Sequence, residues 1–400
     1  MDIKIIQKLK KAADTKIVLL VMDGLGGLPG EEGLTELEKA NTPNLDKLAK
    51  AGICGLHQPI ASGITPGSGP AHLSLFGYNP IKYQVGRGVL AALGINFALK
   101  NGDLAARGNF CTVDNQGKVS DRRAGRISTE KNQELCKLLS QIQLDAAEVF
   151  VETVKEHRFL LVLRGKDLSA DIADTDPQVT GEFPHPPKSL SGEPNKTTKL
   201  IDEFLNKAKE ILADQHPANM ALLRGFSKHP SWPSMQEAFG LNSAAIAGYP
   251  MYRGIAKLLG MSVLETGETI ASQVDTLEKD FDNYDFFYFH VKKTDSYGED
   301  GNFKDKVRVI EETDSLIPRI LKLNPDVILV TGDHSTPFSL ASHSWHPVPT
   351  LLWAKHARTD DVDKFGERAC IKGALGPRIP AVDLIPLALA NALRLEKFGA

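Results

Sequence analysis

The feature that most limits the fold is a set of three short apolar runs, each followed closely by an aspartate. Uninterrupted runs rich in β-branched and aromatic residues are typical of strands buried on both faces of a parallel sheet. These runs alternate with stretches of helical periodicity, which favours an α/β fold with a mostly parallel sheet and helices on both faces. The runs are Ile17–Met22, Asp285–Val291 and Asp326–Val330, and the aspartates are Asp23, Asp295 and Asp333.

The same patterns predict the other elements and the domain organisation. We expect further strands at residues 159–163, 220–223, 244–247 and 350–353, and helices at 42–51, 129–139, 197–212, 304–323 and 382–393. The basic interval 87–131 breaks the alternation, and the proline-rich stretch 174–195 has the composition of a connection or ligand loop. We therefore predict that residues 86–190 form a domain inserted into an α/β domain made of residues 1–85 and 191–400.

Composition excludes several classes of protein. With 47 basic and 50 acidic side chains the formal charge is -3, which argues against a nucleic-acid partner. The longest apolar runs, Ile17–Met22 and Leu384–Leu393, are far shorter than the roughly 20 residues that cross a bilayer. Residues 1–15 are rich in lysine and lack the apolar core of a signal peptide. The four cysteines are far apart in the sequence, which favours reduced thiols and a cytoplasmic location.

The aspartates that follow the three runs suggest a metal site. In open α/β sheets, ligands bind outside the carboxyl ends of the strands, where these side chains could meet. One such aspartate means little, because aspartate is common in turns and helix caps. Here His334 follows Asp333 directly, His343 lies nine residues later, and Glu299 lies four residues after Asp295. Oxygen ligands mixed with imidazole suit divalent Mn, Zn, Co or Mg, and two divalent cations would balance the four carboxylates.

A glycine-flanked serine supplies a candidate nucleophile. Ser68 lies between Gly67 and Gly69, at the expected entry to a helix that runs from Pro70. Glycines let the backbone approach a ligand closely, and the free N–H groups of a helix start attract anions. An ordinary turn with a serine cap is the commoner meaning of this pattern. The neighbouring carboxylate set favours a nucleophile, because a bound metal lowers the pKa of a serine hydroxyl.

These motifs together resemble the alkaline phosphatase superfamily, and most closely the archaeal-type cofactor-independent (2,3-bisphosphoglycerate-independent) phosphoglycerate mutases. The resemblance extends over nearly the whole chain and follows one order. Its segments are VMDGLGG, TPGSGPAHLSLFGY, GRGVLAALGINFAL, RGNFCTVDNQGKVSDRRAGRI, ADTDP, NMALLRG, AGYPMYRGIAKLLGM, HVKKTDSYGEDGN, TGDHSTP and HSWHPVP.

The resemblance implies a metal-bearing phosphatase-like domain interrupted by a smaller α+β domain that grips the substrate. One metal would be held by Asp23, Ser68, Asp333 and His334, and the other by Asp295, Glu299 and His343. The wider superfamily has histidine where Glu299 stands, so we expect a shift toward Mn or Mg, with Zn and Co left open as alternatives. His346 is the weaker of the two histidine candidates near the Pro-Val-Pro segment.

The implied activity is the interconversion of 3-phosphoglycerate and 2-phosphoglycerate, a step of glycolysis and gluconeogenesis, without bisphosphoglycerate. Ser68 would attack the phosphorus, giving a phosphoserine and free glycerate, and the other glycerate hydroxyl would take the group back. The insert would hold the substrate and exclude water. Candidates for binding the substrate or moving a proton are Arg107, Arg122, Arg123, Arg126, Asp171, Asp174, Asp176, Arg253 and Lys292.

Two other functions remain open at this point. The first is a metal-dependent phosphatase or phosphomutase of the same superfamily that acts on another phosphorylated metabolite. The second is a catalytically silent metal-binding or regulatory protein, which only the Glu299 substitution supports. The sequence also leaves open a homo-oligomer and does not identify which arginines contact the substrate.

Overall fold

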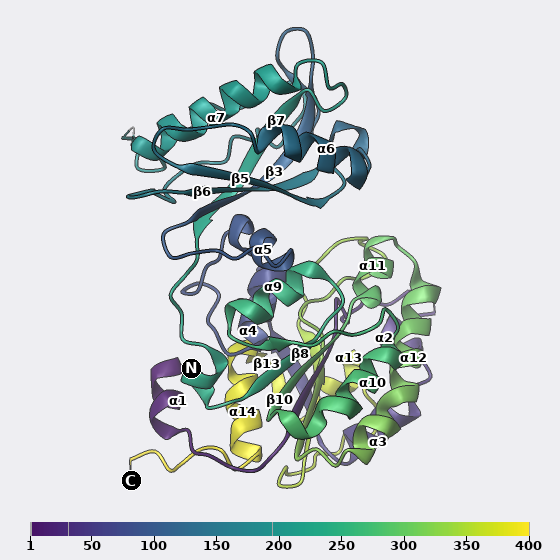
Figure 1. The fold of residues 1–400 in the computed structure, drawn as a ribbon. Coiled ribbons are helices and arrows are strands. Elements are labelled where there is room, and N and C mark those ends of the chain that lie inside the picture. The colour runs from purple at the N-terminus through teal and green to yellow at the C-terminus, as the bar shows by residue number, and fades with distance from the viewer. Residues whose placement is uncertain (1, 31, 194, 400) are drawn as a thin grey trace. The chain divides into compact units, whose positions relative to one another are not determined.

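The computed structural model describes all residues except 1, 31, 194 and 400. The chain divides into a first unit, Met1–Gln84 with Trp232–Ala400, and a second unit, Val85–Ser231 (Figure 1). The second unit therefore ends well after residue 190, where we expected the insert to end. The reason is that α7 (Lys196–Leu212) and β7 (Met220–Lys228) belong to its core and its sheet. Pro194, within the proline-rich stretch, lies outside the described residues.

An eight-stranded sheet, counted over the described residues, forms the centre of the first unit, in the order β13-β2-β12-β11-β1-β10-β8-β9. All pairs are parallel except those of β12, which runs antiparallel to both of its neighbours. The strands are β1 (Ile17–Met22), β2 (Ile53–Gln58), β8 (Ser243–Ile246), β9 (Ser262–Val263), β10 (Phe286–Val291), β11 (Val327–Thr331), β12 (Val348–Ala354) and β13 (Gly376–Pro380).

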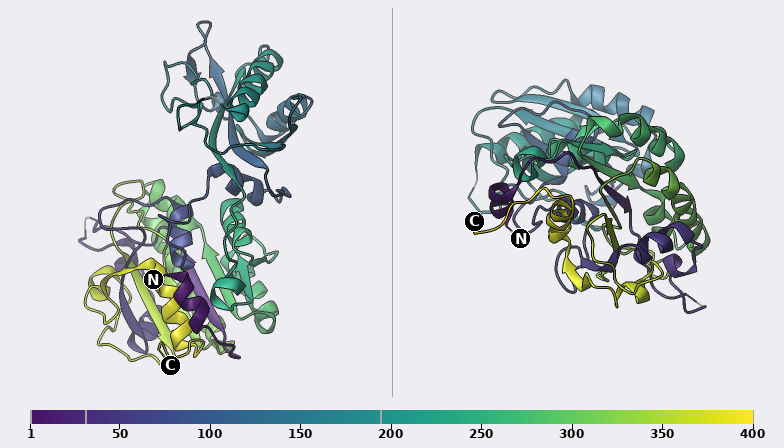
Figure 2. Two further views of the ribbon diagram at one scale, coloured as in Figure 1. Left: turned by 90° about the vertical axis from the view of Figure 1, so that its left-hand side faces the viewer. Right: turned by 90° about the horizontal axis from the view of Figure 1, so that it is seen from below.

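Helices cover both faces of this sheet. Val18, Leu20 and Met22 point into a core shared with α3, α10 and α12, and the alternate residues of β1 face the side on which α4, α9 and α14 lie (Figures 1 and 2). The helices are α1 (Ile3–Leu9), α2 (Glu36–Lys39), α3 (Pro43–Lys50), α4 (Ser68–Leu75), α8 (Met235–Phe239), α9 (Pro250–Leu258), α10 (Ile270–Asp280), α11 (Lys293–Glu299), α12 (Phe303–Lys322), α13 (Glu367–Cys370) and α14 (Leu384–Asn391), with short 3-10 helices at Phe281–Asn283 and Ala381–Asp383.

The second unit is an antiparallel sheet with its own apolar core. Strand β3 (Leu104–Val113) lies between β6 (Arg158–Arg164) and β7, with β5 (Glu148–Lys155) beyond β6 and the short β4 (Val119–Asp121) also paired to β3. Helices α6 (Thr129–Leu139) and α7 lie on one face, and α5 (Arg87–Gly94) lies on the other (Figure 1). A 3-10 turn spans Ala124–Arg126. Residues 174–193 contain no helix or strand, in agreement with the expected loop.

The strand register of the first unit explains how distant residues meet. Strand β1 pairs with β10 and β11 in parallel, so that Met22 lies beside Val291 and Val21 beside Thr331. The three strands therefore end at the same edge of the sheet, and the segments that follow them leave the sheet together. None of the described helices is long and apolar enough to cross a membrane.

Candidate metal centre at the sheet edge

The side chains expected to hold metal come together at this edge, all within the first unit. Asp23 follows β1, Asp333 and His334 follow β11, and Asp295 lies in the helix α11 that follows β10. Ser68 is the first residue of α4, and Gly67 before it occupies the cap position. The serine hydroxyl is therefore not used to cap the helix, and its Oγ lies 3.2 Å from His334 Nε2.

A first group of ligand atoms consists of Asp23, Asp333 and His334, which are all fully buried. His334 Nε2 lies 3.4 Å from Asp23 Oδ1 and 3.2 Å from Asp333 Oδ2. Together with Ser68, these are the four residues that the resemblance implies for one metal. The four side chains converge at one edge of the sheet.

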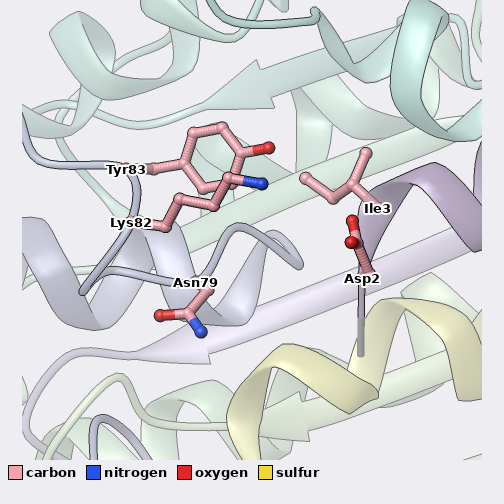
Figure 3. Close-up of a pocket in the computed structure, with 5 residues that line it drawn as sticks. All are labelled: Asp2, Ile3, Asn79, Lys82 and Tyr83. Carbon is pink, nitrogen blue, oxygen red and sulfur yellow. The ribbon is translucent and has the colours of Figure 1, made fainter.

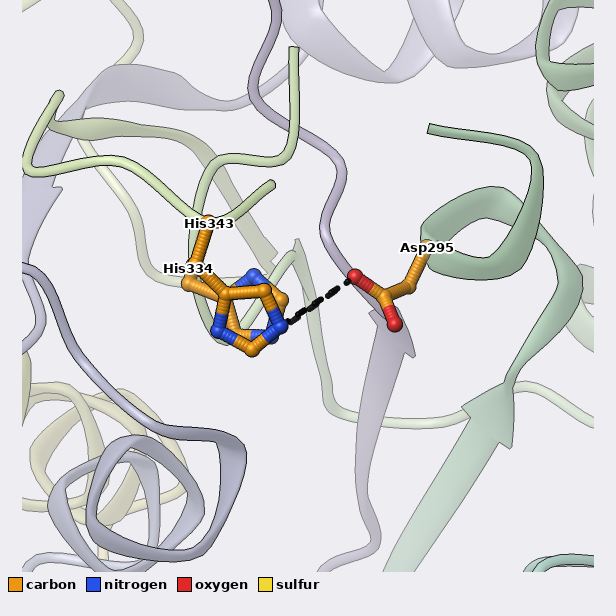
Figure 4. Close-up of side chains that lie close together, drawn as sticks. All are labelled: Asp295, His334 and His343. Carbon is orange, nitrogen blue, oxygen red and sulfur yellow. Dashed lines mark ion pairs between the residues drawn. The ribbon is translucent and has the colours of Figure 1, made fainter. Parts of the chain in front are cut away.

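A second group consists of Asp295, His334 and His343 (Figure 4). His343 Nε2 lies 3.6 Å from Asp295 Oδ1, and the two imidazole rings stack with their centroids 3.7 Å apart. Glu299, the third ligand predicted for this metal, lies at the rim: its Oε1 is 3.7 Å from His343 Nε2 and its side chain is 53% exposed. The structure thus brings the seven predicted ligands together, with His334 common to both groups.

The charges of the site fit a cation. Asp23 Oδ1 and Asp333 Oδ2 are buried and have no hydrogen-bond partner among the described residues. Burial and the charge of Asp23 raise the pKa of Asp333 well above its usual value. Burial also opposes ionisation of Asp23, but the hydrogen bond from His290 and the charge of Lys292 keep the pKa of Asp23 well below the usual value. Two adjacent buried carboxylates with free oxygen atoms are suited to divalent cations.

Four further side chains lie against these ligands, and the sequence interpretation did not assign three of them. Tyr252 donates a short hydrogen bond to Asp23 Oδ2, and His290 Nε2 lies 3.2 Å from the same oxygen. His72 Nδ1 lies 2.9 Å from the Ser68 carbonyl oxygen and 3.2 Å from Asp333 Oδ2. His72 follows Ser68 by four residues on α4, so helical spacing could have revealed it. Tyr252 and His290 reach the site only through tertiary packing.

Lys292, a candidate from sequence, is the fourth of these side chains. Its Nζ lies 3.1 Å from Asp23 Oδ2 and makes a short ion pair with Asp295 Oδ2. Although burial opposes the charged form, these two carboxylates raise the pKa of Lys292 above its usual value. The ammonium group therefore lies between the two ligand groups.

The four candidate arginines of the second unit differ in their exposure and in their partners. Arg122 forms a bidentate ion pair with Asp176. Its Nε lies 3.0 Å from Asp176 Oδ1, and its Nη2 lies 2.7 Å from Oδ2. Arg123 and Arg126 are exposed, at the 3-10 turn Ala124–Arg126. Arg107 is half-buried, and its Nε has no hydrogen-bond partner in the described part of the chain. These arginines therefore do not form a single ligand set.

Arg107 belongs to a cluster of cations that the sequence interpretation did not identify. Its cross-strand partner on β7 is Arg224, and burial together with the charges of Arg87, Arg158 and Arg224 lowers the pKa of Arg107 to about 10. Asp174, another candidate, accepts hydrogen bonds from Arg224 Nε at 3.2 Å and from the Gly225 N–H at 2.8 Å. A cluster in which neighbouring cations lower the pKa of Arg107 is suited to an anionic ligand.

Three candidates have other partners. Arg253 forms an ion pair with the exposed Glu265 at 2.7 Å. Asp171 accepts hydrogen bonds from the side chain of Ser189 and the backbone of Ser191 within its own loop. His346 stacks on Trp345, and its Nδ1 contacts the Ser344 hydroxyl at 3.0 Å. His346 therefore lies outside both ligand groups, and His343 lies within one.

A surface hollow elsewhere in the first unit lacks such chemistry (Figure 3). Its lining includes one carboxylate and one ammonium group and no histidine, and the carboxylate of Asp2 already accepts a hydrogen bond from the Lys4 N–H in α1. The lining residues are Asp2, Ile3, Asn79, Lys82 and Tyr83.

The comparisons with known proteins agree on one protein family. Residues 49–219 match the sequence model of the 2,3-bisphosphoglycerate-independent phosphoglycerate mutase family. The chain is 51% identical to a protein of Thermosipho africanus over 99% of both chains, and 50% identical to one of Aquifex aeolicus over 99% of this chain and 100% of the other. Both are named probable 2,3-bisphosphoglycerate-independent phosphoglycerate mutases.

Two solved structures are similar to the whole chain. A Pyrococcus horikoshii protein has a TM-score of 0.83 at 33% identity and covers 98% of this chain and 100% of its own. The cofactor-independent phosphoglycerate mutase of Thermoplasma acidophilum has a TM-score of 0.75 at 31% identity and covers 94% of this chain and 100% of its own.

Proposed function

The chain belongs to the 2,3-bisphosphoglycerate-independent phosphoglycerate mutases, and on this premise we propose which of its residues carry the reaction. It is an isomerase that interconverts 3-phosphoglycerate and 2-phosphoglycerate. We assign Ser68 as the nucleophile and the surrounding carboxylates and histidines as ligands of two divalent cations. The observation that carries this assignment is a pair of buried oxygens, Asp23 Oδ1 and Asp333 Oδ2, that have no hydrogen-bond partner within the described residues. They lie beside His334 Nε2 and close to the Ser68 hydroxyl.

One cation would be held by Asp23, Ser68, Asp333 and His334, and the other by Asp295, Glu299 and His343. When bound, the cations supply positive charge that lowers the pKa of the Ser68 hydroxyl and stabilises the phosphoryl oxygens. The carboxylate of Glu299 favours the harder ions Mn²⁺ and Mg²⁺ over Zn²⁺.

Ser68 then transfers the phosphoryl group twice. Its Oγ bonds to phosphorus and loses its proton, while the bond from phosphorus to the substrate oxygen breaks and that oxygen gains a proton. The products of this step are a phosphoserine and glycerate. In the second step the other glycerate hydroxyl bonds to phosphorus, its proton leaves, and Ser68 regains a hydroxyl. No bisphosphoglycerate is needed, because the phosphoryl group stays on the enzyme between the steps.

The second unit supplies a binding site for the anionic end of the substrate. Arg107 and Arg224 lie opposite each other on β3 and β7, and Arg87 is close enough to lower the pKa of Arg107. We assign this cluster to the glycerate carboxylate, which matches the planar guanidinium group. Asp174, held by Arg224, is our candidate for moving a proton between the two glycerate hydroxyls, whereas Arg122 already neutralises Asp176.

The test is an enolase-coupled assay with 3-phosphoglycerate and Mn²⁺ and with no bisphosphoglycerate. We expect Ser68→Ala to lower kcat by at least about 10⁴-fold, because the phosphoryl acceptor is lost. The control is Ser74→Ala, which removes a buried serine from the same helix and should keep most of the activity. Mass spectrometry of acid-quenched wild-type enzyme should detect phosphate on Ser68.

An active Ser68→Ala variant would falsify the assignment. Release of phosphate without 2-phosphoglycerate would instead favour a phosphatase of the same superfamily. We also place the enzyme in the cytoplasm, because all four cysteines are free and buried.

A further inference from the structure

Thr336 lies between the two ligand groups and takes part in no step of the proposed reaction. The residue is fully buried and follows His334 by two positions. Its Oγ1 lies 2.7 Å from Asp295 Oδ1 and 2.9 Å from His334 Nδ1. One hydroxyl therefore contacts a proposed ligand of each metal.

The direction of these hydrogen bonds follows from the number of protons. A threonine hydroxyl has one proton, and a carboxylate accepts only, so Thr336 donates its proton to Asp295 Oδ1. The contact with His334 then requires that Nδ1 carries a proton and donates it to Thr336 Oγ1. In the neutral ring this leaves the lone pair on Nε2, which is the atom that faces Ser68 Oγ, Asp23 and Asp333.

The surrounding backbone keeps Thr336 in this place. A Cβ atom on Gly24 would come within 2.6 Å of Thr336 Oγ1, and one on Gly298 within 2.4 Å of the Thr336 carbonyl oxygen. Lys306 Nζ donates to the same carbonyl at 2.8 Å, and the Thr336 N–H donates to the Gly26 carbonyl at 3.0 Å. Two glycines thus leave the space that Thr336 fills, and the loops after β1 and β11 are joined through it.

We propose that Thr336 is a positioning residue that sets the tautomer of His334 and couples the two metal sites through its single hydroxyl. The proposal rests on the proposed function, because it takes His334 and Asp295 to be metal ligands. Removal of the hydroxyl frees the His334 ring to adopt either tautomer and leaves Asp295 Oδ1 without its donor. Both cations should then bind more weakly.

The experiment compares Thr336→Val, which keeps the shape and removes the hydroxyl, with Thr336→Ser, which keeps the hydroxyl. Mn²⁺ binding to each full-length protein is followed by calorimetry and by the electron paramagnetic resonance signal of free Mn²⁺. We expect Thr336→Val to weaken binding at both sites by about 10–100-fold, the usual effect of losing such a partner, and Thr336→Ser to remain within about 3-fold of the wild type. Thr313→Val, which removes a buried hydroxyl from α12, is the matched control and should bind as the wild type does.

A second measurement reads the tautomer itself. In protein labelled with ¹⁵N-histidine, the His334 ring nitrogens should report a proton on Nδ1 in the wild type and in Thr336→Ser, and a mixture of tautomers in Thr336→Val. Wild-type Mn²⁺ affinity and unchanged His334 shifts in Thr336→Val would overturn the inference and leave the proposed function intact. Equal losses in the Val and Ser variants would also overturn it, because packing alone would then explain the effect. Failure of the wild type to bind two Mn²⁺ ions would overturn the proposed metal sites themselves.

Discussion

Glu299 is the most exposed of the seven proposed ligands. Its side chain is 53% exposed, whereas Asp23, Asp295, Asp333 and His334 are buried. A ligand residue at the rim can be replaced by mutation without leaving an unpaired charge in the core. Glu299 is therefore the position at which metal preference can be altered with the least effect on the fold.

We expect Glu299→His to shift the metal preference from Mn²⁺ toward Zn²⁺ by about tenfold or more, because imidazole suits Zn²⁺ better than a carboxylate does. The measurement is the metal content of protein equilibrated with equal concentrations of both ions. Glu312→His, on the exposed side of α12, is the control and should leave the ratio unchanged. An unchanged ratio in Glu299→His would show that Glu299 is not a ligand.

At this scale the sequence predicts residues that directly follow buried strands better than residues that reach the site from elsewhere. Asp23 and Asp333 leave adjacent parallel strands, so their convergence follows from strand order alone. Tyr252 comes from α9, and its contact with Asp23 depends on how that helix packs. No periodicity in the sequence encodes this contact. Arg224 was missed because its partner Arg107 lies on another strand, and the register is not visible from either segment.

Among the elements, α12 and α2 are joined by a buried ion pair between Lys306 and Glu36. Lys306 Nζ lies 3.1 Å from Glu36 Oε1, and both side chains are fully buried. Glu36 Oε1 also accepts a hydrogen bond from the Phe338 N–H at 2.9 Å. The pair thus connects two helices to the loop that carries Thr336.

We expect Lys306→Met to lower the free energy of unfolding by about 3–5 kcal/mol, because it leaves the Glu36 carboxylate buried without its partner. The double variant Lys306→Met with Glu36→Gln should recover part of this loss, since no buried charge remains. Urea unfolding followed by circular dichroism provides the measurement. The exposed pair of Lys355 with Asp326 is the control, and Lys355→Met should cost no more than about 1 kcal/mol. A small loss in Lys306→Met would show that the buried pair contributes little to stability.

The sequence predicts well those elements whose hydrophobic pattern is uninterrupted. Strand β1 has the predicted bounds, because its run of six apolar residues stops at a polar residue on each side, Lys16 and Asp23. Strand β3 was not predicted, since Arg107, Gly108 and Asn109 interrupt its apolar residues. Its central position in the sheet comes from pairing with β6 on one side and β7 on the other, and the sequence of β3 alone does not show this pairing.

For the whole molecule, the first unit is discontinuous and contains all seven proposed ligands, while the second unit is one continuous segment with its own core. Divalent cations should therefore stabilise only the first unit. We expect a chelator to lower the unfolding temperature of one calorimetric transition by about 5–10 °C, as for ligand at about 100 times its Kd, and to leave the other unchanged.

The excised segment Val85–Ser231 identifies the unaffected transition. It should fold alone and unfold at the same temperature with or without chelator, because its core does not depend on the first unit. A segment that stays unfolded, or a chelator shift in both transitions, would contradict this interpretation of the two units. The sequence predicted an inserted domain but not the residue at which it ends. The amphipathic pattern of α7 would be the same whichever of the two units the helix packed against, so it did not show that α7 belongs to the insert.

The discontinuity also affects how the protein is made. Strand β1 is paired along both edges, with Ile17 beside Phe286 and Val327, so a ribosome completes β1 long before either partner. At about 5–20 residues per second, this apolar strand waits on the order of tens of seconds, and the second unit, Val85–Ser231, is completed during that wait. An unpaired strand of this kind is a site for aggregation. The duration of this exposure on the ribosome, more than the stability of the finished enzyme, should govern how its yield in cells responds to translation speed and to chaperones.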